Sequence, residues 1–111
     1  IPAFVKSIDA GRDRLFFEAP VVVVVHSDKH VVMPEATCAF ASLTLTLMAE
    51  ASGLASCMIG FASDALRCRD DLREQLGIPA GNQVYYVLVM GYPLEHFTGI
   101  PEREPPNVSW R

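Results

Sequence analysis

The sequence predicts an α+β fold, an α/β-like half-domain in which helices flank one central sheet and an extended C-terminal arm follows. Two strand-length apolar runs, 21–25 and 84–90, are separated by helical stretches. Pro93 and the three prolines of residues 94–111 exclude regular structure at the C-terminus. The chain has 111 residues, which fits a single domain over 1–111.

The first predicted strand covers residues 21–26 and follows Pro20. Five consecutive valines favour a strand, because β-branched side chains fit a pleated surface. The run does not alternate with polar residues, so we expect both faces to be buried and the strand to be central. Residues 1–14 are expected to hold the end of a helix that Gly11 terminates.

Residues 35–52 form the longest predicted helix. Apolar side chains recur at spacings of three and four, and Glu50 is the one charged residue after Glu35. A helix that is apolar on nearly every side is expected to be buried. In so short a chain, burial on every side points to a dimer interface. Gly53 is placed to end the helix.

The second half of the chain alternates strands and helices. Residues 54–61 are expected to form a short strand that ends at Gly60, and Ser63 is expected to cap a helix over 64–76. Gly77 ends that helix, and residues 84–90 form a strand with two buried faces. Residues 94–111 form the extended arm.

Composition excludes several classes of protein. A net charge of −4 lacks the basic surface of a general nucleic-acid binder. No apolar run reaches the roughly 18–20 residues that span a membrane. A hydrophobic content of 50% is too high for a disordered tail. The three cysteines are odd in number and lack metal-binding spacing, which favours a reducing cytoplasm.

No side-chain catalyst or metal site is predicted. His26 and His30 are four residues apart but lie at a strand end and in a turn, so they are expected to be structural. If the protein is an enzyme, a cofactor carries its chemistry. Ile59-Gly60 and Arg103 are the candidate contacts, with a plain turn and a solvated arginine as alternatives. Tyr85, Tyr86 and Phe61 are candidate pocket residues, although core packing is the favoured role for each of them.

Five motifs occur in an order that resembles a known family. They are FFEAP (16–20), GLASCMIGF (53–61), LREQLGIP (72–79), MGYP (90–93) and PEREPPNVSW (101–110). Together they resemble the C-terminal half of the nitroreductase family of FMN-dependent flavoproteins. Two positions depart from the family pattern: Ala55 replaces a glycine, and Thr37 stands where many members have aspartate. The resemblance implies that residues 1–111 are the C-terminal portion of a longer domain, whose phosphate-binding segment lies upstream.

The resemblance implies a homodimer with FMN at the subunit interface. The stretch Cys57, Met58, Ile59 and Gly60 would offer backbone N–H groups to flavin N5 and O4, and Arg103 would bind the FMN phosphate. Helix 35–52 would be the dimer helix, and the arm would wrap the partner. The implied activity passes electrons from NAD(P)H through FMN to nitroaromatics, quinones or similar flat acceptors.

Other interpretations remain open. The chain could be a non-enzymatic dimeric scaffold that has lost flavin, or a flavoprotein with dehalogenating or flavin-fragmenting chemistry. The dimer-helix sequence also resembles members that carry an iron–sulfur ferredoxin domain, which would lie upstream of Ile1. We expect residues 1–111 by themselves to form a dimer that binds FMN weakly or not at all.

Overall fold

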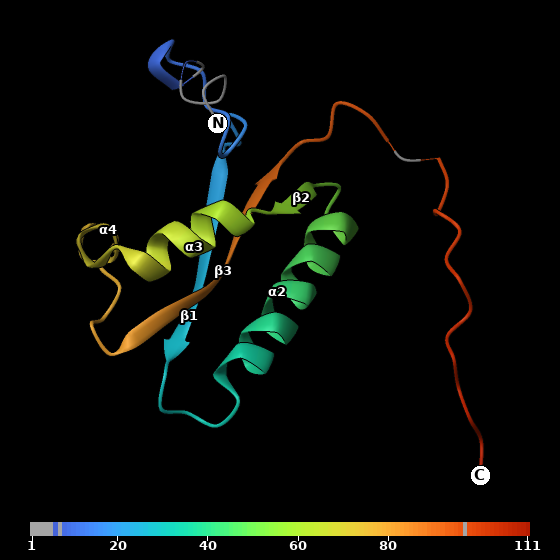
Figure 1. Ribbon diagram of the computed structural model, residues 1–111. Helices are drawn as coiled ribbons and strands as arrows, with labels where there is room; N and C mark the ends of the chain where they lie inside the picture. Colours follow the sequence, from blue (N-terminus) through green and yellow to red (C-terminus); the bar gives the residue numbers. More distant parts are fainter. Residues whose placement is uncertain (1–5, 7, 97) are drawn as a thin grey trace.

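The computed structural model describes residues 6, 8–96 and 98–111, which form the predicted α+β architecture (Figure 1). Strands β1 (Val21–Asp28), β2 (Ala55–Met58) and β3 (Asn82–Gly91) make an antiparallel sheet in the order β1-β3-β2. Helix α2 (Pro34–Ala51) connects β1 to β2, and α3 (Gly60–Cys68) and α4 (Asp70–Gln75) connect β2 to β3. Within the described part of the chain, no helix is long and apolar enough to cross a membrane.

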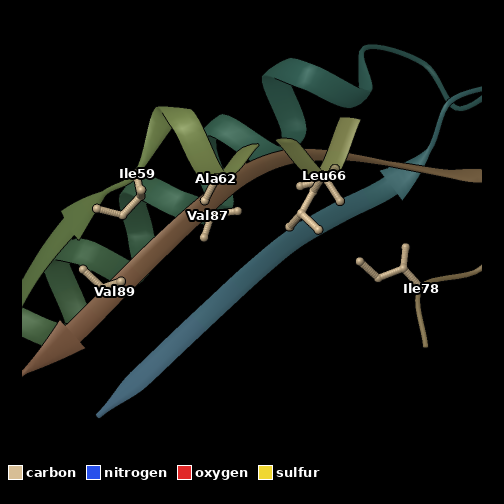
Figure 2. Close-up of a cluster of buried hydrophobic side chains, with 7 residues drawn as sticks. Ile59, Ala62, Leu66, Ile78, Val87 and Val89 are labelled. Carbon is tan, nitrogen blue, oxygen red and sulfur yellow. The ribbon is translucent and has the colours of Figure 1, made fainter. Parts of the chain in front are cut away.

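Strand β3 is the centre of the sheet, and both of its faces are covered as predicted. Val87 and Val89 belong to a buried cluster with Ala62 and Leu66 of α3 (Figure 2). Leu88 is fully buried. Because side chains alternate along a strand, Leu88 faces the opposite side, where α2 packs across the sheet. The sheet is therefore enclosed between helices at its middle.

The valine run is not a central strand in the described structure, so that prediction is wrong. Strand β1 pairs with β3 alone and lies at the edge of the described sheet. Val21 and Val22 are 49% and 42% exposed. A run of valines reports a preference for the extended backbone, but it does not determine which neighbour lies beside the strand.

Helix α2 agrees with its predicted bounds to within one residue at each end. It terminates in a Schellman motif, in which the Gly53 N–H donates to Glu50 O and the Leu54 N–H donates to Ala49 O. Gly53 has φ +74°, as this motif requires. The motif turns the chain directly into β2.

Only one face of α2 is buried within this chain. Small side chains face the sheet: Cys38, Ser42 and Ala49. The opposite side exposes large apolar side chains: Phe40, Leu43, Leu47 and Met48. The prediction that this helix is buried on nearly every side is therefore not met within the described residues. Burial of the exposed side would require another protein surface packed against α2.

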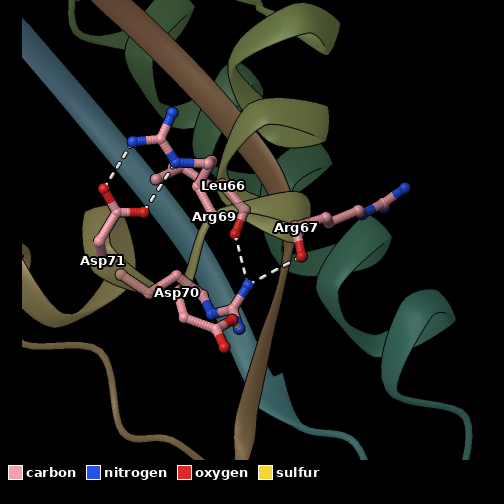
Figure 3. Close-up of polar contacts among 6 residues, drawn as sticks. Leu66, Arg67, Arg69, Asp70 and Asp71 are labelled. Atoms are coloured by element: carbon pink, nitrogen blue, oxygen red, sulfur yellow. Dashed lines mark hydrogen bonds and ion pairs between the residues drawn. The ribbon is translucent and has the colours of Figure 1, made fainter.

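The predicted helix over 64–76 begins earlier and is divided in two. Helix α3 begins at Gly60, so Ser63 is not its N-cap; the Ser63 hydroxyl instead donates to Ile59 O at 3.3 Å. Arg69 adopts an extended conformation between α3 and α4. The Arg73 guanidinium donates to the carbonyls of Leu66 and Arg67, which satisfies the end of α3 (Figure 3).

The C-terminal arm has no helix or strand in its described residues, as predicted. Residues 94–96 and 98–111 are exposed. Figure 1 shows the arm leaving the end of β3 beside β2 and running away from the sheet. It adds nothing to the core of its own chain.

We predict that Gly53→Ala destabilises the chain by about 1 kcal/mol, because a Cβ is strained at positive φ. Chemical unfolding of the two proteins measures the difference. Gly81→Ala is the matched control, since Gly81 has open space around its Cβ position and no positive φ. Equal losses in both variants would contradict the role of the Schellman motif.

Candidate functional site

A hollow of about 500 Å³ lies at the junction of β2 and α3, and all four residues predicted for the flavin edge line it. These residues are Cys57, Met58, Ile59 and Gly60. Residues of the turn that precedes β1 also line the hollow. Its size falls within the range of small-molecule sites.

The start of α3 supplies unpaired backbone donors to this hollow. The first helical bond runs from the Ser63 N–H to Ile59 O, and no side chain caps the helix. The N–H groups of Gly60, Phe61 and Ala62 therefore precede the first helical bond. These groups carry the partial positive charge of the helix N-terminus. A Cβ built at Gly60 meets nothing within 4 Å, so a ligand can approach its backbone closely.

Two of the four predicted donors are used within the sheet. The Ile59 N–H donates to Val87 O at 2.8 Å. Alternate N–H groups of a strand point to opposite sides, so Cys57 also points toward β3, whereas Met58 points to the outer edge. The available donors are Met58 and Gly60. Cys57 and Ile59 remain lining residues, which corrects the prediction that the whole stretch donates.

The structure adds residues that the sequence did not single out. Arg14, Phe17 and Asp64 line the same hollow. Phe61 is 83% exposed at the hollow and is not a core residue, whereas Tyr85 and Tyr86 line a different hollow at the start of α2. Phe17 lies within the FFEAP motif (16–20), and Arg14 lies two residues before it. The position of this motif directly before β1 was the one signal in the sequence that could have indicated them.

A carboxylate organises the turn that carries Arg14 and Phe17. Asp13 Oδ1 accepts from the Leu15 and Phe16 N–H groups at 3.0 and 2.8 Å, and Oδ2 accepts from the Glu18 N–H at 3.1 Å. The Phe16 N–H is the main cause that holds the pKa of Asp13 below its usual value. Asp13 is therefore ionised at neutral pH.

Arg103 is not brought to the hollow within this chain. It lies exposed in the arm and does not line the hollow. A contact between Arg103 and a ligand in the hollow therefore requires the arm to bend back or to reach another subunit.

Cys57 lines the hollow, but the described histidines and the other two cysteines do not. His26 Nδ1 lies 2.8 Å from Asn82 Nδ2, in a contact that joins the ends of β1 and β3. Cys57 and Cys68 are exposed free thiols, and Cys38 is a buried one whose pKa is raised by burial. A second hollow of about 450 Å³, between β1, α3 and α4, is almost entirely aliphatic and contains none of the predicted site residues.

The fold and the hollow define an α+β domain whose site offers backbone donors, one cation (Arg14) and one carboxylate (Asp64). The family profile described as "Nitroreductase family" matches residues 2–92. The chain belongs to the nitroreductase family. No curated protein matches the chain significantly.

Solved structures share this fold. An FMN-dependent nitroreductase from Clostridium difficile R20291 is 26% identical, with a TM-score of 0.61 over 76% of this chain and 51% of that one. A nitroreductase with bound FMN from Bacteroides fragilis NCTC 9343 is 22% identical, with a TM-score of 0.71 over 92% of this chain and 58% of that one.

A nitroreductase with bound FMN from Desulfitobacterium hafniense DCB-2 is 24% identical, with a TM-score of 0.67 over 97% of this chain and 58% of that one. The chain thus spans between half and three fifths of the length of these structures. The nitroreductase fold assigned to it refers to this portion.

Proposed function

We propose that this chain is part of an FMN-dependent oxidoreductase that passes electrons from NAD(P)H to a flat acceptor such as a nitroaromatic or a quinone. The observation that carries the proposal is the set of donors around one hollow: the Met58 and Gly60 N–H groups, the N-terminus of α3 and Arg14. FMN would supply hydride and electron transfer, which no side chain of the hollow provides.

The chemistry of the hollow suits the isoalloxazine ring of a flavin. Its ring is flat with two apolar faces, and its edge carries hydrogen-bond acceptors. Phe17 and Phe61 offer apolar contact surface, because they are 67% and 83% exposed at the hollow. Met58 and Gly60 offer donors to the polar edge. The residues present therefore fit this part of the cofactor.

The electrostatics of the hollow favour a reduced flavin. The N-terminus of α3 and the Arg14 guanidinium both place positive charge there. The Asp64 carboxylate also lines the hollow, but it is paired with Arg67 at 3.8 Å. Fixed dipoles and charges of this kind stabilise negative charge without reorganising. These groups would bind and orient the ring and stabilise the negative charge that reduction adds to it.

The phosphate of FMN requires a separate anchor, and we propose Arg103 for it. Arginine binds phosphate through paired N–H donors. The arm runs away from the sheet (Figure 1), and none of its described residues lines the hollow. This role therefore fits an assembly in which the arm lies along another subunit.

The exposed side of α2 supports a homodimer. Four large apolar side chains project from one face of a regular helix, and such a patch marks an interaction surface. We propose that α2 of one subunit packs against α2 of the other. The free thiols are compatible with the predicted reducing cytoplasm, which stays a prediction.

The first test measures FMN binding by the full-length protein and by Gly60→Pro. We expect the wild-type protein to bind FMN and to be reduced by NADH or NADPH. Proline is tolerated at the first position of a helix, so Gly60→Pro removes one N–H while α3 is retained. Loss of that hydrogen bond should weaken FMN binding by about 1–3 kcal/mol.

Gly60→Ala is the control, because it adds a Cβ at the hollow but keeps the N–H. Any loss of FMN affinity in Gly60→Ala measures the added Cβ, and the loss in Gly60→Pro should exceed it. A wild-type protein that ignores added FMN would refute the proposed function and favour the flavin-free scaffold.

The phosphate anchor is tested by Arg103→Gln. We expect FMN affinity to fall by roughly 1.5–3 kcal/mol, whereas riboflavin, which lacks the phosphate, should bind equally to both proteins. Isothermal titration of each ligand measures this difference. Arg111→Gln in the same arm is the control. Equal losses for FMN and riboflavin would show that Arg103 does not contact the phosphate.

The dimer interface is tested by Leu43→Lys, which places a charge on the exposed apolar face of α2. Light scattering after gel filtration should show a shift from dimer to monomer, because a buried unpaired charge opposes association. Ala80→Lys, in an exposed turn, adds the same charge and should remain dimeric. An unchanged mass for Leu43→Lys would place the interface elsewhere.

A further inference from the structure

The turn of residues 13–19 has an unusual backbone. Phe17 and Glu18 both have positive φ, +55° and +57°. Two consecutive non-glycine residues in the left-handed region are costly, since each Cβ lies close to a carbonyl oxygen. Such a conformation persists only where surrounding contacts determine it.

Asp13 supplies those contacts. Its carboxylate accepts three backbone N–H groups, those of Leu15, Phe16 and Glu18, and so spans the turn. The Ala19 N–H also donates to Phe16 O. In the described residues, this is the one side chain that bonds to several backbone donors of the turn.

The turn divides its side chains between the core and the hollow. Leu15 and Phe16 pack against the buried cluster of α3 and β3. Arg14 and Phe17 line the hollow on the other side, and Leu15 contacts both regions. A change in the backbone of this turn would therefore rotate Arg14 and Phe17 relative to Gly60.

We propose that Asp13 is a positioning residue for the flavin site, which fixes Arg14 and Phe17 at the hollow by holding the turn. The inference rests on the proposed function. Asp13 acts through the backbone and does not contact the ligand.

The charge balance is consistent with this role. Both Asp13 oxygens are occupied by backbone N–H groups, and the ion pairs found among the described residues do not include Arg14. The Arg14 charge is thus available to the hollow. The carboxylate of Asp13 is ionised at neutral pH, so its three acceptor bonds are charge-assisted, and these bonds lower its pKa further.

The experiment is a double-mutant cycle in the full-length protein, with the midpoint potential of bound FMN as the readout. Arg14→Gln should lower the potential, because it removes a charge that stabilises the reduced flavin. Asp13→Ala should lower it in the same direction and weaken FMN binding about tenfold. The double variant should match Arg14→Gln in potential, because displacing an absent charge has no further effect.

Two further variants provide a milder substitution at position 13 and a control. Asp13→Asn retains an acceptor for Leu15 and Phe16 but presents a donor to the Glu18 N–H, so its potential should lie between wild type and Asp13→Ala. Asp13→Asn also replaces Asp13→Ala in the cycle if Asp13→Ala does not fold. Asp71→Ala is the matched control, since it removes a carboxylate bonded to Arg69 on α4, away from the hollow (Figure 3).

The outcomes separate this inference from the proposed function. No FMN binding by the wild-type protein refutes the proposed function itself. If FMN binds and Arg14→Gln shifts the potential, but the Asp13 variants lower only thermal stability, Asp13 is merely structural and the inference is overturned. Additive shifts in the double variant would also overturn it.

Discussion

The hydrogen bond from the Ile59 N–H to Val87 O is the constraint on which the rest of the site depends. It extends the pairing of β2 with β3 by one step beyond Met58, and it holds Ile59 extended immediately before a helix. The helix must then begin at Gly60, and its first N–H groups have no internal partner. The single hydrogen bond between Ile59 and Val87 thus directs the Met58 and Gly60 N–H groups to the outer edge of the sheet.

Strand β3 supports this junction because it is secured along both of its sides. Strand β2 covers only its last residues, so the carbonyls of Val84 and Tyr85 would lack a neighbouring strand on that side. The Arg67 guanidinium donates to both carbonyls at 3.0 and 3.1 Å and lies 5.9 Å from the Tyr85 ring centre. A side chain of α3 thereby replaces a strand and ties the helix to the sheet.

The sequence predicted those features that local chemistry determines. Glycines at positions that require positive φ ended α2 and α4 where expected, and the apolar run of β3 became the central strand. The predictions from the sequence were wrong where a tertiary contact determines the structure. Ser63 has the residue type of an N-cap, but the bond to Val87 O starts α3 one turn earlier, and the valines of β1 lie at an edge. The sequence did not predict Arg14 as a site residue, because its contact with the hollow depends on the conformation of the turn of residues 13–19.

A site made mainly of backbone groups tolerates changes of side chain. Ala55 departs from the glycine that the resemblance implies, but it lies in β2 without positive φ, so the strand accepts it. Thr37 departs from the aspartate that the resemblance implies, and it donates its hydroxyl to Met33 O within the first turn of α2. Neither change affects the N–H groups of Met58 and Gly60. The sequence must retain only the side chains that supply charge to the site. On our proposal these are Arg14 at the hollow and Arg103 in the arm.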